Sequence, residues 1–86
     1  MRRRLPPERK HLRSIGEALT TVRQWRRLTH RQLAERADLP QSSISLLERG
    51  LEEPSLGMFE KLGAALGVEP TLILWLGYHY QDWVKK

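Results

Sequence analysis

Residues 29–50 read THRQLAERADLPQSSISLLERG, and this stretch decides the fold. Thr29 and Gln32 form a capping box of the T-x-x-Q type, in which each side chain accepts a hydrogen bond from the backbone amide of the other residue. Pro40 suits the first position of a second helix, because its missing N–H would have no partner there in any case. Gly50 is the usual kind of residue just after a helix end. The stretch therefore predicts two short helices joined by a tight turn.

The turn and the flanking helices follow from similar signals. Asp38 falls in the turn, where a left-handed backbone is usual and where Asp is tolerated less well than Gly. Further helices are predicted over about residues 14–27, 55–67 and 70–77. Gly63, inside one of them, predicts the close approach of another chain segment. The residues expected to face the core are Ile15, Leu19, Val22, Trp25, Leu28, Leu33, Ala34, Ala37, Leu39, Ile44, Leu47, Leu56, Phe59, Leu62 and Leu66.

The composition restricts the class of protein. The chain has 86 residues and no cysteine, so it forms one small domain without a disulfide framework or a thiolate zinc site. A core this thin would gain from a partner subunit. No apolar run approaches the roughly 20 residues that span a bilayer, and no apolar segment follows the basic N-terminus as a secretory signal requires.

The excess positive charge lies at the N-terminus. The net charge is +5, and residues 1–13 hold six Lys or Arg against one Glu, whereas residues 14–86 hold nine of each sign. A basic segment beside a neutral domain favours a polyanion partner, and a solvated tail that aids solubility is the alternative. We expect a flexible basic arm over 1–13, a helical domain over 14–77 and an aromatic C-terminal tail over 78–86.

The order of these signals resembles the phage-repressor and Cro-like (XRE-type) helix-turn-helix family of DNA-binding domains. The resemblance covers about residues 15–76 and implies an all-α, compact five-helix, lambda-repressor-like domain that binds operator DNA as a dimer. Helices of about eight residues also pack better as an orthogonal array than as an up-down bundle. The matching stretches are Ile15-Gly16-Glu17-Ala18-Leu19, Leu28-Thr29, Gln32-Leu33-Ala34-Glu35, Ser42-Ser43-Ile44-Ser45, Glu48-Arg49-Gly50, Pro54-Ser55-Leu56 and Leu62 to Val68.

By this resemblance, the helix that starts near Gln41 is the recognition helix, and its first residues enter the major groove. Gln41 is the expected main base reader, since its amide can bond both N6 and N7 of adenine. Leu46 departs from the family, which usually carries a polar or basic residue there. Leu46 either touches a thymine methyl or is an ordinary half-exposed apolar side chain. The predicted base-reading residues are Gln41, Ser42, Ser45 and Leu46.

Phosphate contacts are expected at the start of the preceding helix, where free backbone amides suit an anion. His30 stands where the family often has Gln, and it is either a phosphate donor or a solvent-facing residue. Glu52 and Glu53 stand where relatives often carry Lys or Arg, and they weaken binding unless they point away. The basic arm either reaches the neighbouring minor groove, as homeodomain arms do, or stays solvated. The predicted phosphate-contacting residues are Thr29, His30, Arg31, Arg49, Arg2, Arg3 and Arg4.

Two further expectations concern how the domain is held together. In relatives, the Glu before the Gly pairs with an Arg of the first helix, which implies an ion pair between Glu48 and Arg23 here. Residues 71–76 are apolar on all sides of a helix and are followed by aromatic residues, which favours a homodimer interface. In the alternative, the tail folds back over the first helix around Trp25. The predicted interface residues are Leu72, Trp75, Leu76, Tyr78 and Trp83.

Catalysis and metal binding are not indicated. The three His residues are scattered, and no nucleophile is paired with a base. We expect no enzyme, no cofactor and no metal. The leading hypothesis is a sequence-specific transcriptional regulator, a repressor that binds a pseudo-palindromic operator as a homodimer. It would be cytoplasmic, in a bacterium or phage-infected cell, and nucleoid-associated when bound. The alternative is a protein-interaction module of the same fold, such as a bridging cofactor or an antitoxin that binds a toxin.

Overall fold

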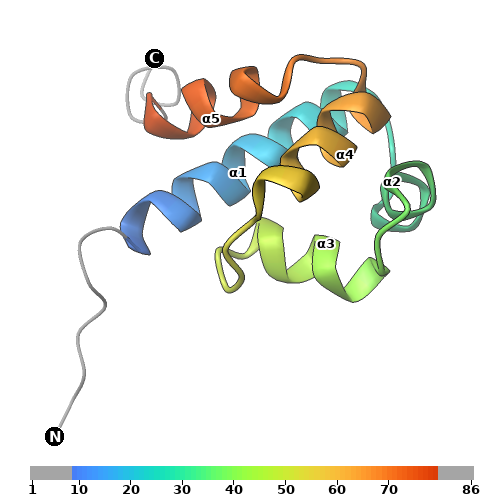
Figure 1. Cartoon of the computed structure of the whole chain (residues 1–86), viewed down its shortest axis with the longest axis horizontal. Coiled ribbons are helices and arrows are strands. Elements are labelled where there is room, and N and C mark those ends of the chain that lie inside the picture. Colours follow the sequence, from blue (N-terminus) through green and yellow to red (C-terminus); the bar gives the residue numbers. More distant parts are fainter. Residues whose placement is uncertain (1–8, 80–86) are drawn as a thin grey trace, which may run out of the picture.

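The computed structural model describes residues 9–79, which form five helices joined by short connectors (Figure 1). No strand occurs within that range, and the predicted five-helix all-α fold is confirmed. None of the helices described there is long and apolar enough to cross a membrane. The helices are α1 (Arg9–Trp25), α2 (His30–Ala37), α3 (Gln41–Glu48), α4 (Leu56–Leu66) and α5 (Pro70–Tyr78).

The predicted capping signals set the helix ends. Thr29 Oγ1 accepts from the Gln32 N–H at 3.0 Å, and Gln32 Oε1 accepts from the Thr29 N–H at 2.9 Å, which completes the capping box of α2. Ser55 caps α4 through its hydroxyl in the same way. Gly67 ends α4 with a φ of 72°, and Asp38 ends α2 with a φ of 57°. Because a left-handed backbone is costly for a residue with a Cβ, Asp38 carries local strain that the α2–α3 turn requires.

The bounds of α1 differ from the predicted ones. α1 begins at Arg9, inside the segment predicted as an arm, and Leu12 extends its buried face toward the N-terminus. At the other end it stops at Trp25, and Arg27 adopts a left-handed φ of 58°. The side chain of Trp25 is 63% exposed, so its predicted place in the core is wrong.

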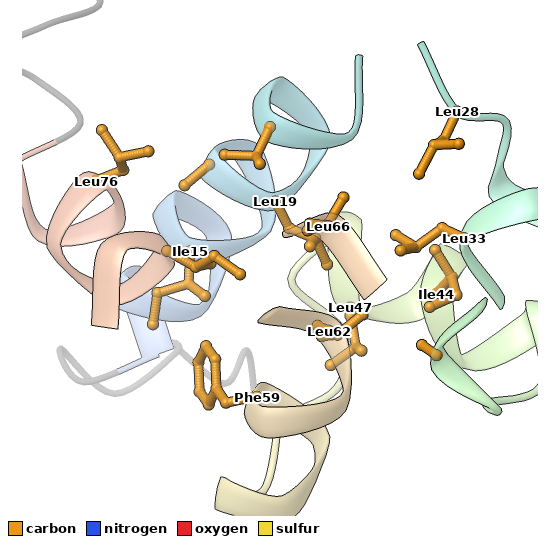
Figure 2. Packing of buried hydrophobic residues seen from close by; sticks show 14 of the residues in the cluster. Ile15, Leu19, Leu28, Leu33, Ile44, Leu47, Phe59, Leu62, Leu66 and Leu76 are labelled. Atoms are coloured by element: carbon orange, nitrogen blue, oxygen red, sulfur yellow. The ribbon is translucent and has the colours of Figure 1, made fainter. Parts of the chain in front are cut away.

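The core is one apolar cluster to which all five helices contribute (Figure 2). The largest fully buried side chains are Leu33, Ile44, Leu62, Ile73 and Val22. Burying a side chain of this size stabilises a fold by about 1.5–3 kcal/mol. Leu56 was expected inside but is 76% exposed, because it is the first residue of α4 and precedes the buried stripe that starts at Phe59.

Glycines allow other segments to approach α1 and α4 closely. α5 runs antiparallel to α1 along one side (Figure 1), and a Cβ at Gly77 would lie only 2.7 Å from Ile15 Cγ1. Gly77 lies inside α5, one residue before its end, and its missing side chain permits this packing. A Cβ at Gly16 would lie 2.5 Å from the carbonyl oxygen of Leu47 in α3. At Gly63, the predicted close approach is confirmed, because a Cβ there would lie 2.8 Å from a backbone oxygen of the α4–α5 connector.

Candidate nucleic-acid interface

α2 and α3 pack through their inner faces and leave the outer face of α3 to solvent. The buried residues of α2 are Leu33, Ala34 and Ala37, and those of α3 are Ile44 and Leu47. The N–H groups of residues 38 and 39 donate back to carbonyls of α2, at 3.4 and 3.0 Å, and tighten the turn between the two helices. The arrangement holds α3 by one side and by its end, as a reading helix requires.

The predicted base-reading residues occupy the outer side of α3. Gln41 and Ser42 are exposed, whereas Ser45 and Leu46 are half-buried. At about 100° per residue, Ser42, Ser45 and Leu46 fall on the side opposite the buried Ile44 and Leu47, and Gln41 lies at the edge of that side. Gln41 also lines an open depression between α2 and the start of α3, together with the exposed Arg31. Gln41 is therefore open to solvent and to a ligand on this side of α3.

Glu48, the last residue of α3, lies at the centre of a polar cluster with residues of α1 and α2. Arg23 donates to both of its carboxylate oxygens, from Nε to Oε2 at 2.7 Å and from Nη2 to Oε1 at 3.2 Å. The ion pair that the resemblance implied is thus present, with side-chain exposures of 12% for Arg23 and 6% for Glu48. Thr20 Oγ1 and His30 Nε2 also contact Oε1, at 2.9 and 2.8 Å. Arg23 Nη1 donates to the Leu28 carbonyl at 2.7 Å and so ties the α1–α2 connector to the same cluster.

The cluster joins the end of α3 to α1 and to the start of α2. Arg23 reaches both carboxylate oxygens of Glu48, and Thr20 and His30 contact Oε1 as well. Within residues 9–79, no buried side-chain nitrogen or oxygen is left without a hydrogen-bond partner. A bidentate Arg–carboxylate pair is also directional, so the cluster fixes the orientation of α3 relative to the other two helices.

Sequence reasoning identified only part of this cluster. Thr20 was missed, although it lies three residues before Arg23 and therefore on the same face of α1. The bond from His30 to Glu48 had no sequence signal, because it spans 18 positions and depends on how the turn folds. The His30 side chain is 39% exposed, so the ring contacts Glu48 and solvent at once. Neither sequence alternative, a phosphate donor or a solvent-facing residue, included the contact with Glu48.

The other predicted phosphate contacts within residues 9–79 are exposed. Thr29 and Arg31 flank the first residue of α2, and the Arg31 side chain is 79% exposed, 3.5 Å from Glu35. Arg49 is exposed directly after α3, where Glu53 is exposed as well. Arg2, Arg3 and Arg4 lie outside the described residues.

A second exposed surface runs along α5. Leu72, Trp75 and Tyr78 recur every three residues and are 37%, 55% and 60% exposed; we call them the aromatic stripe. The Trp75 ring stacks on His79 at a centroid distance of 4.3 Å, and the Tyr78 ring lies 4.6 Å from that of His11 in α1.

The prediction for the same interface also named Leu76 and Trp83. Leu76 is only 8% exposed and belongs to the core, so the expectation of an exposed contact there is wrong. Its side chain is drawn inward because it falls on the face of α5 that packs against α1. Trp83 and the rest of the tail, including the alternative that it folds back over α1, lie outside the described residues.

Known proteins are similar to this chain in both sequence and fold. A family described as a helix-turn-helix domain matches residues 14–76. An immunity repressor protein of Bacillus phage phi105 is 36% identical over 61 residues, which cover 71% of this chain and 42% of that protein. An uncharacterised HTH-type transcriptional regulator of Sinorhizobium fredii is 38% identical over 58 residues, which cover 67% of this chain and 30% of that protein. The chain therefore spans less than half the length of these two relatives.

Two solved structures match this chain over a larger share of their own length. The restriction-modification controller protein C.AhdI from Aeromonas hydrophila has a TM-score of 0.71 and 32% identity, covering 72% of this chain and 94% of that one. The clp gene regulator ClgR from C. glutamicum has a TM-score of 0.76 and 29% identity, covering 88% and 95% of the two chains. The chain belongs to the helix-turn-helix family of DNA-binding regulators, in its phage-repressor-like (XRE-type) branch.

Proposed function

We propose that this domain is a sequence-specific DNA-binding transcriptional regulator that places α3 in the major groove of duplex DNA. The observation that carries the proposal is the division of α3 into two sides. Its inner side and its end are fixed by the core and by the Glu48 cluster, while Gln41 and Ser42 on its outer side are exposed. A reading helix needs this combination, because base contacts discriminate only when the helix is held in one orientation.

Phosphate contacts in this proposal come from both ends of the α2–α3 unit. The backbone amides at the start of α2 and the Arg31 side chain face one phosphate strand, and Arg49 faces the phosphates near the other end. The basic residues Arg2, Arg3 and Arg4 add contacts from the N-terminal segment, in line with the net charge of +5.

We further propose that the protein binds as a homodimer through the aromatic stripe of α5. Exposed aromatic and leucine side chains in one row are typical of interface cores, and a domain this small gains stability from a second copy. Two α3 helices related by a two-fold axis would read half-sites about one DNA turn apart. The similarity to a phage immunity repressor supports repression as the sign of regulation.

Selection of bound duplexes from a random pool tests the proposal most directly. We expect enrichment of a pseudo-palindromic site whose half-sites are spaced by about 10 base pairs. The affinity for the selected duplex should fall steeply as salt increases, because counterions are released from the phosphates. A pool that remains random, together with no duplex binding at low salt, would contradict the proposal.

A second candidate function is a protein-interaction module, such as an antitoxin or a bridging cofactor. It is favoured by the connector after α3, where Leu51 is 58% exposed and Glu53 is exposed. An apolar and acidic segment suits a basic protein partner better than a phosphate strand. A purified partner that binds the domain and lowers its affinity for the selected duplex would support this role. A connector that only becomes protected when DNA is added would contradict it.

A further inference from the structure

We infer that DNA binding by this domain takes up a proton at His30, so that the imidazolium bridges Glu48 and a backbone phosphate. The inference rests on the proposed function and concerns how that same site responds to pH. It starts from one contact, in which His30 Nε2 lies 2.8 Å from Glu48 Oε1 while the His30 side chain stays 39% exposed.

The neighbouring hydrogen bonds determine which His30 nitrogen carries a proton. Arg23 donates to both oxygens of Glu48, and a guanidinium is never an acceptor. This two-point contact is the Arg23–Glu48 ion pair, in which Glu48 is the acceptor. His30 Nε2 must then be the donor in the contact with Glu48. In the neutral ring, Nδ1 is left as a bare acceptor.

A bare acceptor cannot bind a phosphate, whose exposed oxygens are acceptors as well. Nε2 faces a carboxylate that is only 6% exposed, so the accessible edge of the ring is the one away from Glu48. His30 is the first residue of α2, beside backbone amides that attract an anion. A phosphate there favours the imidazolium, which donates from Nδ1 to the phosphate and from Nε2 to Glu48.

The charged groups around the ring lie on three helices. Glu48 on α3 contacts the ring directly, and Arg23 on α1 is paired with the same carboxylate. On α2 itself, the Arg31 guanidinium lies 3.5 Å from Glu35 and is 79% exposed, so solvent screens its charge. Histidine is also the side chain that ordinarily changes charge between about pH 5 and 8. We therefore expect tighter DNA binding at lower pH.

Calorimetry of binding in buffers with different ionisation enthalpies measures the uptake directly. The probe is a short mixed-sequence duplex, since phosphate contacts do not depend on the operator. We expect the wild-type protein to take up a fraction of one proton, and His30→Gln to lose that uptake. The Gln amide donates without titrating, so Glu48 keeps a hydrogen-bond partner. His11→Gln is the matched control, because His11 contacts Tyr78 on another part of the molecule.

The salt dependence supplies a second readout. The slope of log K against log salt should be steeper by roughly 0.9 at about pH 6 than at about pH 8, which corresponds to one additional phosphate contact. Affinity should rise about tenfold over the same interval, as for a hydrogen bond to a charged group. The permanently charged His30→Arg variant should bind tightly at both pH values. These changes in slope and affinity should be absent in His30→Gln.

The outcomes separate this inference from the proposed function. Duplex binding with the same proton uptake in wild type and His30→Gln would overturn the role of His30 and leave the DNA-binding function intact. A salt slope of wild-type binding that does not change with pH would likewise overturn the role of His30 and leave the DNA-binding function intact. No duplex binding at low salt at either pH would overturn both the function and the inference.

Discussion

α3 and α5 both pack against α1, but they are held by different kinds of contact. The end of α3 is anchored by a carboxylate that is 6% exposed and receives hydrogen bonds from Arg23, Thr20 and His30. α5 is held by apolar contact, with Gly77 placed directly against Ile15. The outward surfaces differ in the same sense, because α3 presents mainly polar side chains and α5 presents the aromatic stripe.

The two kinds of contact serve different purposes. One fixes the orientation of a helix, and the other holds two surfaces together. Hydrogen bonds to a buried carboxylate are directional, so they fix the angle of a helix that has to meet base edges. Apolar packing is non-directional and scales with the area removed from water, which suits a helix that covers α1 on one side and meets a second copy on the other. Substitutions in α3 and in α5 should therefore impair different properties of the protein.

The largest expected effect comes from removing the carboxylate that anchors α3. Glu48→Ala leaves the Arg23 guanidinium, only 12% exposed, without its charged partner. We expect a loss of about 3–5 kcal/mol in the free energy of unfolding, measured by denaturant titration. Glu35→Ala is the control, because its pair with Arg31 is exposed and worth no more than about 0.5 kcal/mol. Equal losses in the two variants would show that the cluster does not anchor α3.

A smaller effect, on assembly alone, is expected from the aromatic stripe. Trp75→Ala should weaken the proposed dimer by at least about 2 kcal/mol, or roughly 30-fold, as for other interface aromatic anchors. The unfolding of the monomer should hardly change, because the Trp75 side chain is 55% exposed. Sedimentation over a range of concentrations measures the dimer. Leu56→Ala is the control, since Leu56 is 76% exposed but lies on α4. A dimer that dissociates equally in both variants would place the interface elsewhere.

The close contact between α5 and α1 is tested by adding a methyl group to α5 where the two helices meet. Gly77→Ala places a Cβ 2.9 Å from the backbone Cα of Ile15, so α5 has to shift away from α1. We expect a loss of about 1–3 kcal/mol in unfolding free energy. Gly57→Ala meets no atom closer than 3.9 Å and should instead gain roughly 0.5–1 kcal/mol from better helix propensity. A gain in both variants would mean that α5 is not packed closely on α1.

Features set by adjacent residues were predictable from the sequence. The capping box of Thr29 and Gln32 and the N-cap Ser55 depend only on residues within one turn. The buried positions Ile44 and Leu47 followed from helical spacing, and the pair of Glu48 with Arg23 from a family pattern.

The point at which a buried face stops along a helix was not predictable, and neither were most contacts with a distant segment. Periodicity extended the buried faces to Trp25 and Leu56, but each lies at a helix end beyond the reach of the core. Gly77 resembles a helix stop in the sequence, and only its contact with α1 shows a packing role. The bond between His30 and Glu48 arises because the turn brings the start of α2 to the end of α3.

Base reading by α3 is tested at Gln41, an exposed polar residue in its first turn. Gln41→Ala should weaken binding to the selected duplex by about 1–3 kcal/mol and relax the preference at one base pair per half-site. Its unfolding free energy should stay unchanged, because Gln41 is exposed. Competition binding against single-base variants of the duplex measures the preference. An affinity loss that is the same for every sequence would assign Gln41 to phosphate contact rather than to base reading.

The smallest expected effect concerns Glu53, an exposed residue of the connector that follows α3. If the connector lies near the phosphates, Glu53→Gln removes a repulsion and should strengthen duplex binding by about 0.2–1 kcal/mol at low salt. The gain should fade as salt increases, because exposed charges are screened within about 10 Å. Glu60→Gln changes the net charge equally from an exposed position on α4. If both variants bind more tightly by the same factor, only net charge matters, and the connector points away from the DNA. If only Glu53→Gln gains, the connector lies beside the phosphates and limits the affinity of the α3 surface.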